Sequence, residues 1–190
     1  MTNIIFIRHA PTKIDKHTVA KNWILREDSA QLCQLLAQQI DQYAISKIYT
    51  STELKAQLTG QYIAEALKLD TPIISDNLQE TASSTFYESE QEFRETVIVA
   101  MKNPHSLLFG EETFADAKKR FSAQVESLAQ AHPQETIAIV THGRILSMYL
   151  GDIMPENPDI IWERLQMPAY AVLSWETKEI LEIMYSVDNL

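Results

Sequence analysis

The apolar residues of this chain fall into short uninterrupted runs and into longer segments with helical spacing. The runs at 3–7 and 137–140 are rich in β-branched residues and have no polar alternation, which is typical of strands buried on both faces of a parallel sheet. A short run at 47–50 and a weaker one at 72–75 predict two further strands. The chain therefore has the pattern of a sheet with a buried centre.

The segments between these runs carry apolar residues three and four positions apart, which predicts helices with one buried face. Asp28 or Ser29 can cap the first of them, and Thr113 can cap a later one. The other predicted helices lie at 52–68, at 88–101 and in a short stretch ending near Leu150.

Strands that alternate with helices predict an α/β fold of three layers, α/β/α, with a mostly parallel central sheet and right-handed crossovers. Residues 170–175 and 179–185 are expected to form a closing pair of strands. The sequence contains no repeat, low-complexity tract or flexible linker, so residues 1–190 are predicted to form a single domain. Residues 85–112, with one helix and some loop, are predicted to form a small helical cap, here called the cap segment.

In a sheet of this kind the functional site lies beyond the carboxyl ends of the strands. Arg8 and His9 follow the first predicted strand, and residues 51–55, which end in Lys55, follow the second. Glu80 lies in the loop after the third strand and His142 follows the fourth. Two histidines, two cations and one carboxylate are therefore expected to meet at one edge of the sheet.

The charge balance limits the ligands that such a site can take. The formal net charge is -10, from 26 acidic and 16 basic side chains, so the surface as a whole repels nucleic acid and anionic lipid. It also repels free phosphate, and an anion site therefore requires locally clustered cations. The apolar runs are shorter than the ~20 residues that a membrane-spanning helix needs. The single cysteine, Cys33, is compatible with a reducing compartment, and we expect a cytoplasmic protein without nucleic-acid or membrane partners.

The residues at the predicted edge match the needs of phosphoryl transfer, which are a nucleophile, positive donors to the phosphoryl oxygens and an acid for the leaving group. The imidazole of His9 can attack phosphorus and form a phosphohistidine. Arg8 and Lys55 supply positive charge, and a protonated His142 would be a third donor. Glu80 is the candidate proton donor, with Glu88 and Glu90 as alternatives.

These residues resemble the motifs of the histidine phosphatase superfamily, which includes the cofactor-dependent phosphoglycerate mutases. The matching stretches, in chain order, are Arg8-His9-Ala10-Pro11-Thr12, Ser51-Thr52-Glu53-Leu54-Lys55-Ala56 with Thr59, Leu78-Gln79-Glu80, and Thr141-His142-Gly143. The resemblance implies a phosphoglycerate mutase-like fold in which His9 is phosphorylated, Arg8 and His142 bind phosphate, and Glu80 acts as general acid and then base. It also implies that Lys55 replaces a second arginine and that Thr12 lies beside the pocket.

The sequence departs from the family pattern in three places. Lys55 stands where the family has arginine, and loss of the arginine fork is expected to weaken phosphate binding about ten- to a hundredfold. Asp15 lies where many relatives have asparagine, so its carboxylate would oppose a phosphate dianion unless it pairs with Lys13 or Lys16. Phe86 matches an aromatic residue of the family, whereas Ser84 replaces a usual glycine.

The sequence thus predicts a phosphatase for a small phosphomonoester that works through phospho-His9 with neither a metal nor an organic cofactor. A small cap favours a phosphatase over a mutase, which must exclude water. The alternatives are a weakened family member that binds a phosphorylated ligand or a protein partner, a phosphoglycerate mutase-type phosphotransferase, a protein phosphohistidine phosphatase, and a metal-dependent hydrolase built on His9, His142 and Glu80. Lys55 could also be an exposed residue of an acidic helix.

The closing strands offer an edge of the sheet at which two copies of the chain could form a homodimer. The candidate substrate contacts are Trp23, Phe86, Tyr87 and Phe109.

Overall fold

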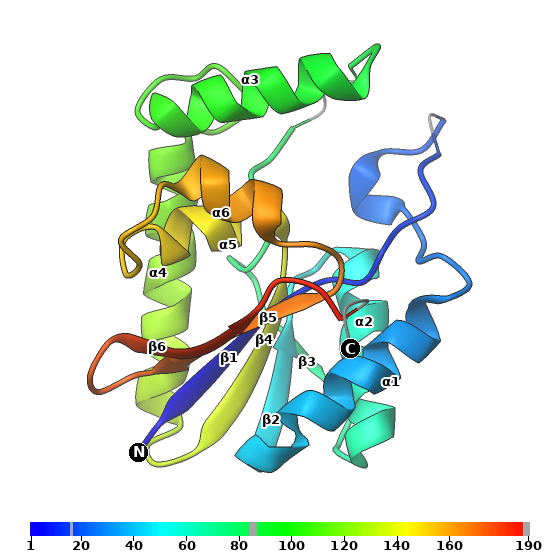
Figure 1. Ribbon diagram of the computed structural model, residues 1–190, viewed down its shortest axis with the longest axis vertical. Coiled ribbons are helices and arrows are strands. Elements are labelled where there is room, and N and C mark those ends of the chain that lie inside the picture. Colours follow the sequence, from blue (N-terminus) through cyan, green and yellow to red (C-terminus); the bar gives the residue numbers. More distant parts are fainter. Residues whose placement is uncertain (16, 84–86, 188–190) are drawn as a thin grey trace.

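The computed structural model describes residues 1–15, 17–83 and 87–187 (Figure 1). Its single sheet has six strands in the order β3-β2-β4-β1-β5-β6. The strands are β1 (Asn3–Arg8), β2 (Ile45–Thr50), β3 (Ile73–Ile74), β4 (Thr136–Thr141), β5 (Ala169–Ser174) and β6 (Glu179–Met184). The pairs β1–β4, β2–β4 and β2–β3 are parallel, whereas β5 is antiparallel to both β1 and β6. The predicted mostly parallel sheet and its closing strand pair are confirmed.

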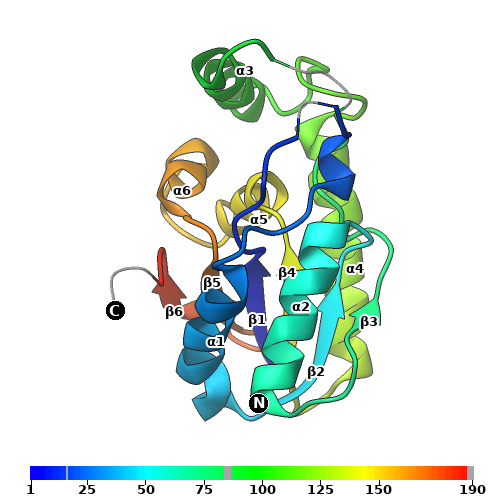
Figure 2. The same cartoon turned by 90° about the vertical axis from the view of Figure 1, so that its right-hand side faces the viewer.

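Helices cover both faces of this sheet, which confirms the predicted three-layer architecture (Figures 1 and 2). On one face lie α1 (Ser29–Ile40) and α2 (Leu54–Leu67), and on the other lie α4 (Phe114–Ala131), α5 (Gly143–Leu150) and α6 (Pro158–Arg164). Two 3₁₀ helices, η1 (Ala20–Asn22) and η2 (Asp41–Tyr43), follow β1 and α1.

Strand β1 shows why an uninterrupted apolar run predicted a central strand. Successive side chains of a strand point to opposite faces of the sheet. Ile4 and Phe6 accordingly belong to the core beneath α4, whereas Ile5 and Ile7 belong to the core beneath α1 and α2. All four side chains are fully buried, and burial of each stabilises the fold by about 1.5 to 3 kcal/mol relative to exposure.

Of the two predicted helix caps, one forms and the other does not. The hydroxyl of Thr113 accepts a hydrogen bond from Asp116 N at 3.1 Å and caps α4 as predicted. At the start of α1, Asp28 makes no capping bond, because its carboxylate pairs with Arg26. Ser29 donates to the carbonyl of Pro11 at 3.0 Å instead, so this helix is tied to the loop after β1.

Helix α3 (Glu90–Lys102) lies across the end of the molecule, above α6 (Figure 1), within the predicted cap segment. It packs through Val97, Ala100 and Met101 against a cluster that includes Phe114 and Trp162. Of the cap segment, 85 and 86 lie outside the described residues. Helix α6 was not predicted; it begins with Pro158, and its buried Trp162 supports α3.

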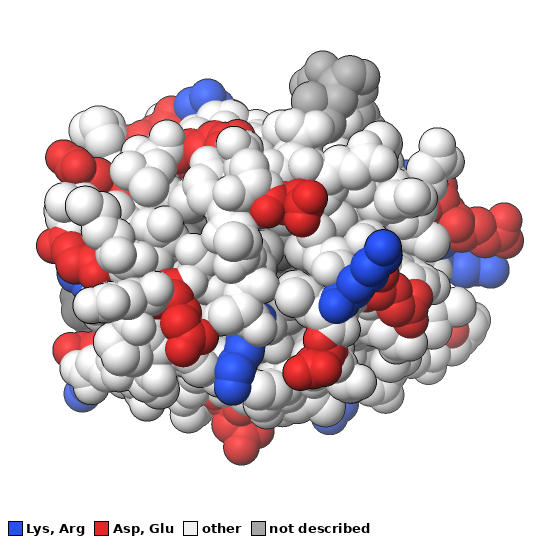
Figure 3. Space-filling model, turned by 90° about the horizontal axis from the view of Figure 1, so that it is seen from below, with Lys and Arg blue, Asp and Glu red and all other residues white. Residues whose placement is uncertain are grey.

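The acidic charge is spread over the surface. At the end of the molecule where β1 begins, Asp and Glu side chains are scattered among neutral ones, with Lys and Arg between them (Figure 3). Over the described residues, no helix has the length and apolar character needed to cross a membrane.

Candidate active site

The pairing of β1 with β4 brings the two predicted site histidines together. Arg8 lies opposite Thr141 in the parallel register, so the residues that follow, His9 and His142, leave the sheet side by side. The amide of His9 donates to the carbonyl of Thr141 at 3.0 Å. The two imidazole centroids are 5.2 Å apart, with the rings edge to face at 61°.

The imidazole of His9 is held in one orientation and one tautomer. Its Nδ1 lies 2.8 Å from the carbonyl oxygen of Ala10, which can only accept a hydrogen bond, so Nδ1 carries the proton and Nε2 keeps its lone pair. Burial, followed by the nearby His142, Lys55 and Arg8, holds the pKa of His9 well below its usual 6.5. At neutral pH the ring therefore presents an unprotonated nitrogen, as a nucleophile requires.

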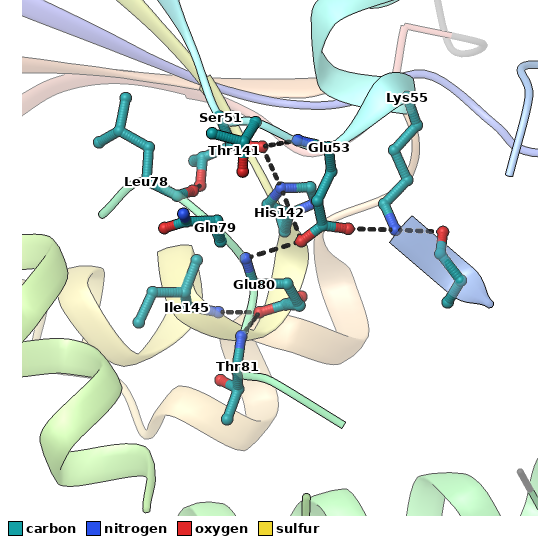
Figure 4. Close-up of polar contacts among 12 residues, drawn as sticks. Ser51, Glu53, Lys55, Leu78, Gln79, Glu80, Thr81, Thr141, His142 and Ile145 are labelled. Carbon is teal, nitrogen blue, oxygen red and sulfur yellow. Dashed lines mark hydrogen bonds and ion pairs between the residues drawn. The ribbon is translucent and has the colours of Figure 1, made fainter. Parts of the chain in front are cut away.

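His142 is completely buried at the start of α5. Its Nε2 lies 2.6 Å from the hydroxyl of Ser51 and 3.4 Å from Oε1 of Glu53 (Figure 4). Its Nδ1 is buried and has no hydrogen-bond partner in the described part of the chain. Burial, with Lys55 as the next cause, lowers the pKa of His142 well below 6.5. The neutral ring therefore has one polar atom ready for a ligand.

Arg8 supplies a fixed positive charge beneath the start of α5. Its guanidinium donates to the carbonyl of Leu165, and its Nε is buried without a partner among the described residues. Burial lowers the pKa of Arg8 to about 10, although the carboxylate of Glu80 opposes the shift. Arg8 is therefore charged at neutral pH.

Lys55 lies in the first turn of α2 and is only 6% exposed, so the interpretation as a surface lysine is wrong. Its ammonium lies 2.8 Å from Oε2 of Glu53 and donates to the carbonyl of Ala20 at 3.0 Å. The indole of Trp23 lies 6.0 Å from the same nitrogen. The family motif position is thus filled by a buried cation, and its charge helps to lower the pKa of His9 and of His142.

Glu80 reaches the site but is strongly held by backbone amides. Its Oε1 accepts from Thr81 N at 3.0 Å and from Ile145 N at 2.9 Å, and its Oε2 accepts from Arg144 N at 3.0 Å. Burial would raise the pKa of Glu80, but the charge of Arg144 and these amides outweigh it and lower the pKa. In this state Glu80 is ionised and anchors the N-terminus of α5 to the loop after β3.

The remaining predicted positions shape the loop after β1. The backbone of half-buried Thr12 forms an antiparallel bridge with Leu25. The carboxylate of exposed Asp15 accepts from His17 N at 2.9 Å and from the hydroxyl of Thr18 at 2.8 Å, so it stabilises its own turn. Thr59 accepts from Ala10 N at 3.0 Å, which ties this loop to α2. Lys16, Ser84 and Phe86 lie outside the described residues.

Glu53 was not assigned a role from the sequence, yet its carboxylate lies in the centre of the site (Figure 4). Besides Lys55 and His142, it contacts the amide of Glu80, which donates to Oε1 at 3.0 Å. Burial would raise the pKa of Glu53, but Lys55 outweighs it and lowers the pKa. The sequence signal for a role of Glu53 was its place two residues before Lys55, in the same stretch that follows β2.

Arg144 was also missed and connects the site to the cap segment. Its guanidinium lies over the rings of Phe109, at 4.8 Å, and of Phe93, at 5.7 Å. The ring of Tyr87 stacks on Phe109 with a centroid distance of 5.9 Å. Arg144 also donates to the carbonyl of Thr81 at 3.2 Å, so its guanidinium joins the aromatic residues of the cap segment to the loop that carries Glu80.

This arrangement can bind an anion and transfer a group to an imidazole nitrogen. Two cations and the unpaired Nδ1 of His142 surround a histidine whose Nε2 is unprotonated. Within the described residues, no group of three or more His, Cys, Asp or Glu side chains is arranged to hold a metal ion.

Comparisons with known proteins point to one family. Residues 4–181 match the family model of the histidine phosphatase superfamily (branch 1). The chain is 25% identical over 151 residues to phosphoserine phosphatase 1 of Hydrogenobacter thermophilus, covering 75% of this chain and 71% of that protein. Among solved structures, a phosphoserine phosphatase of Entamoeba histolytica is 18% identical with a TM-score of 0.76 over 100% of both chains. YhfR of Bacillus stearothermophilus is 22% identical with a TM-score of 0.75, covering 97% of this chain and 96% of the other.

Proposed function

The chain belongs to the histidine phosphatase superfamily (branch 1), which confirms the resemblance stated above, and on this premise we propose that it hydrolyses a small phosphomonoester through a phosphohistidine on His9. The observation that carries the proposal is the hydrogen bond from Nδ1 of His9 to Ala10, which leaves Nε2 unprotonated beside Arg8, Lys55 and His142. A neutral imidazole nitrogen among cations suits attack on an anionic phosphoryl group.

In the first proposed half-reaction, the lone pair of His9 Nε2 attacks phosphorus and the bond from phosphorus to the ester oxygen breaks. Arg8, Lys55 and Nδ1 of His142 bind the three spectator oxygens. For Nδ1 to donate, the imidazole of His142 must carry its proton there, which requires Nε2 to accept from Ser51. The departing alkoxide takes a proton and leaves as an alcohol.

In the second half-reaction, water attacks the phosphorus of phospho-His9, and the nitrogen–phosphorus bond breaks to release inorganic phosphate. Glu80 is the proposed proton donor in the first half and the base for water in the second. Its amide contacts favour the ionised form in the free protein. Entry of a phosphoryl group adds negative charge nearby, which raises the pKa of a carboxyl group and favours its protonation. Both half-reactions use only side chains of this chain and water.

The cap segment is the proposed determinant of the alcohol part of the substrate. Tyr87, Phe93 and Phe109 form an aromatic group over Arg144, next to the loop of Glu80. Phosphoserine and 3-phosphoglycerate are the first substrates to test, because similar proteins are named for, or complexed with, these compounds.

We also propose that the protein is cytoplasmic. The exposed edge of the sheet at β6 is the proposed contact of a homodimer, and the mass of the protein in solution would test this.

The experiment that tests the function is hydrolysis of p-nitrophenyl phosphate, phosphoserine and 3-phosphoglycerate by the wild type and His9→Ala. Exposed His105 provides the matched control His105→Ala. We expect the wild type and the control to release phosphate, in the presence or absence of a chelator, and His9→Ala to be inactive. Equal rates for all three proteins, or no release by any of them, would contradict the proposal.

A further inference from the structure

The carboxylate of Glu53 takes the contact with Lys55 that the proposed function reserves for a phosphoryl group. One of its oxygens lies 2.8 Å from the ammonium of Lys55. The other accepts from the amide of Glu80 at 3.0 Å and lies 3.4 Å from Nε2 of His142. Figure 4 shows this carboxylate between the lysine and the imidazole. An anionic group of the chain itself is therefore paired with one of the proposed phosphate ligands, Lys55, beside the imidazole of a second, His142.

The side chains around Glu53 are buried and most of their charges are paired, as they would be around a bound ligand. The side chains of Glu53 and Lys55 are only 12% and 8% exposed, and His142 is fully buried. Arg8, Lys55 and Arg144 bring three positive charges to this region, and the ionised Glu53 and Glu80 offset two of them. A phosphate dianion would meet two carboxylates in a closed space, which opposes binding.

The local backbone explains how Glu53 reaches this place and how it could leave. Glu53 is the residue just before α2, and its backbone is extended, with φ -80° and ψ 135°. Its side chain therefore stands outside the helix and turns by rotation about its own bonds. When it turns away, Lys55 keeps its hydrogen bond to Ala20 and remains beside Trp23. The cation thus stays in position for another anion.

We propose that Glu53 is a specificity-determining residue that occupies the phosphoryl pocket as an internal anion and must move away from Lys55 before a substrate or inorganic phosphate can bind. The inference rests on the proposed function, because it identifies the pocket by the same ligands. It implies that the chain binds phosphate more weakly than its cations allow. It also implies that only substrates with further favourable contacts to the protein displace Glu53 efficiently.

A competing role for Glu53 is that of proton donor in place of Glu80. The two roles differ in what removal of its charge does. Neutralising an internal anion strengthens phosphate binding and leaves kcat unimpaired, whereas neutralising a proton donor lowers kcat, whatever it does to phosphate affinity.

The test is calorimetric titration of inorganic phosphate into the wild type, Glu53→Gln and Glu53→Ala, at neutral pH and constant ionic strength. Glu65→Gln, at an exposed position of α2, the helix that follows Glu53, is the matched control. We expect Glu53→Gln to bind phosphate at least about tenfold more tightly, because Lys55 then offers its charge to the ligand. Acetate should weaken phosphate binding to Glu53→Ala by taking the place of the lost carboxylate, and should not affect the wild type. Equal or weaker phosphate binding by folded Glu53→Gln would overturn the proposal.

A crystal structure of the wild type with bound phosphate tests the inference without any substitution. We expect the Glu53 carboxylate to lie beyond ion-pair distance from Lys55, and phosphate bound with the 2.8 Å contact intact would overturn the inference. The proposed function is tested separately, because it requires turnover and phosphorylation of His9. Tighter phosphate binding by Glu53→Gln in a protein that never phosphorylates His9 would refute the function alone.

Discussion

The guanidinium of Arg8 lies so close to Gly143 that a Cβ atom at Gly143 would be 2.7 Å from Cζ and 2.8 Å from Nε of Arg8. Carbon atoms do not approach at these distances, so any side chain at this position must displace the guanidinium. The glycine after His142 is therefore required by the arginine before His9. This contact adds to the pairing of β1 with β4 in linking two stretches far apart in the chain, each part of a family motif.

Gly143→Ala is expected to lower kcat/KM by about ten- to a hundredfold, since it displaces one charge-assisted contact to the phosphoryl group. Stability should fall as well, because the buried guanidinium of Arg8 must shift from its contact with Leu165. Steady-state kinetics and thermal unfolding of the same preparation check this. Unchanged kinetics in a folded variant would mean that Arg8 does not bind the substrate.

The buried ion pair of Lys55 and Glu53 predicts an asymmetric effect on stability. Lys55→Met leaves a buried carboxylate without its cation, and we expect it to reduce the free energy of unfolding by about 3 to 5 kcal/mol. Adding Glu53→Gln should restore much of the loss. The exposed pair of Arg94 and Glu163 is the control, for which Arg94→Met should cost about 0 to 1 kcal/mol. Urea unfolding measures all of these variants, and equal losses in the two single variants would refute the prediction.

The two buried histidines predict a loss of stability in mild acid. Their pKa values in the folded protein lie well below 6.5, so below the ordinary pKa of about 6.5 the unfolded chain binds protons that the folded chain does not. Stability therefore falls as the pH drops through this value and continues to fall until the folded-state pKa values are reached. Urea midpoints between about pH 8 and pH 5 measure the slope, which His9→Phe should reduce and His105→Ala should not. A slope that His9→Phe leaves unchanged would show that His9 titrates normally.

Glu80→Gln is expected to abolish most turnover, by about a hundredfold or more, because it removes the proposed acid and base. It should also loosen α5, whose first amides bind both carboxylate oxygens. The folded-state pKa of Glu80 is lowered, so its contribution to stability is present above its ordinary value of about 4.5 and is lost as the pH falls through the folded value. Unfolding of the variant should thus be less sensitive to strong acid. Full activity in Glu80→Gln would assign the proton to another group.

The mostly parallel sheet and the meeting of the motifs could be predicted from the sequence because both follow from local signals. An unbroken apolar run such as that of β1 has one stable place in an α/β fold, the centre of the sheet. Parallel strands then bring their carboxyl ends to one edge, which places His9 beside His142. These inferences need neither side-chain orientation nor long-range charge.

The features that the sequence did not reveal depend on tertiary contacts. Helix α6 is short, and its packing residues Ile161 and Trp162 give too little periodicity to be recognised. The capping role of Asp28 was wrong because Arg26 competes for its carboxylate. The position of Glu53 depends on a rotamer in an extended segment, and a surface glutamate and a buried one look alike in the sequence.

Phosphorylation of His9 is the central claim, and rapid-quench mass spectrometry of the intact protein mixed with phosphoserine or p-nitrophenyl phosphate tests it most directly. The account predicts a transient adduct of one phosphoryl group on His9 in the wild type and none in His9→Ala. With p-nitrophenyl phosphate, whose leaving group needs no proton, the adduct should reach a higher level in Glu80→Gln. Turnover of substrate by the wild type without such an adduct, or an adduct that persists in His9→Ala, would contradict it.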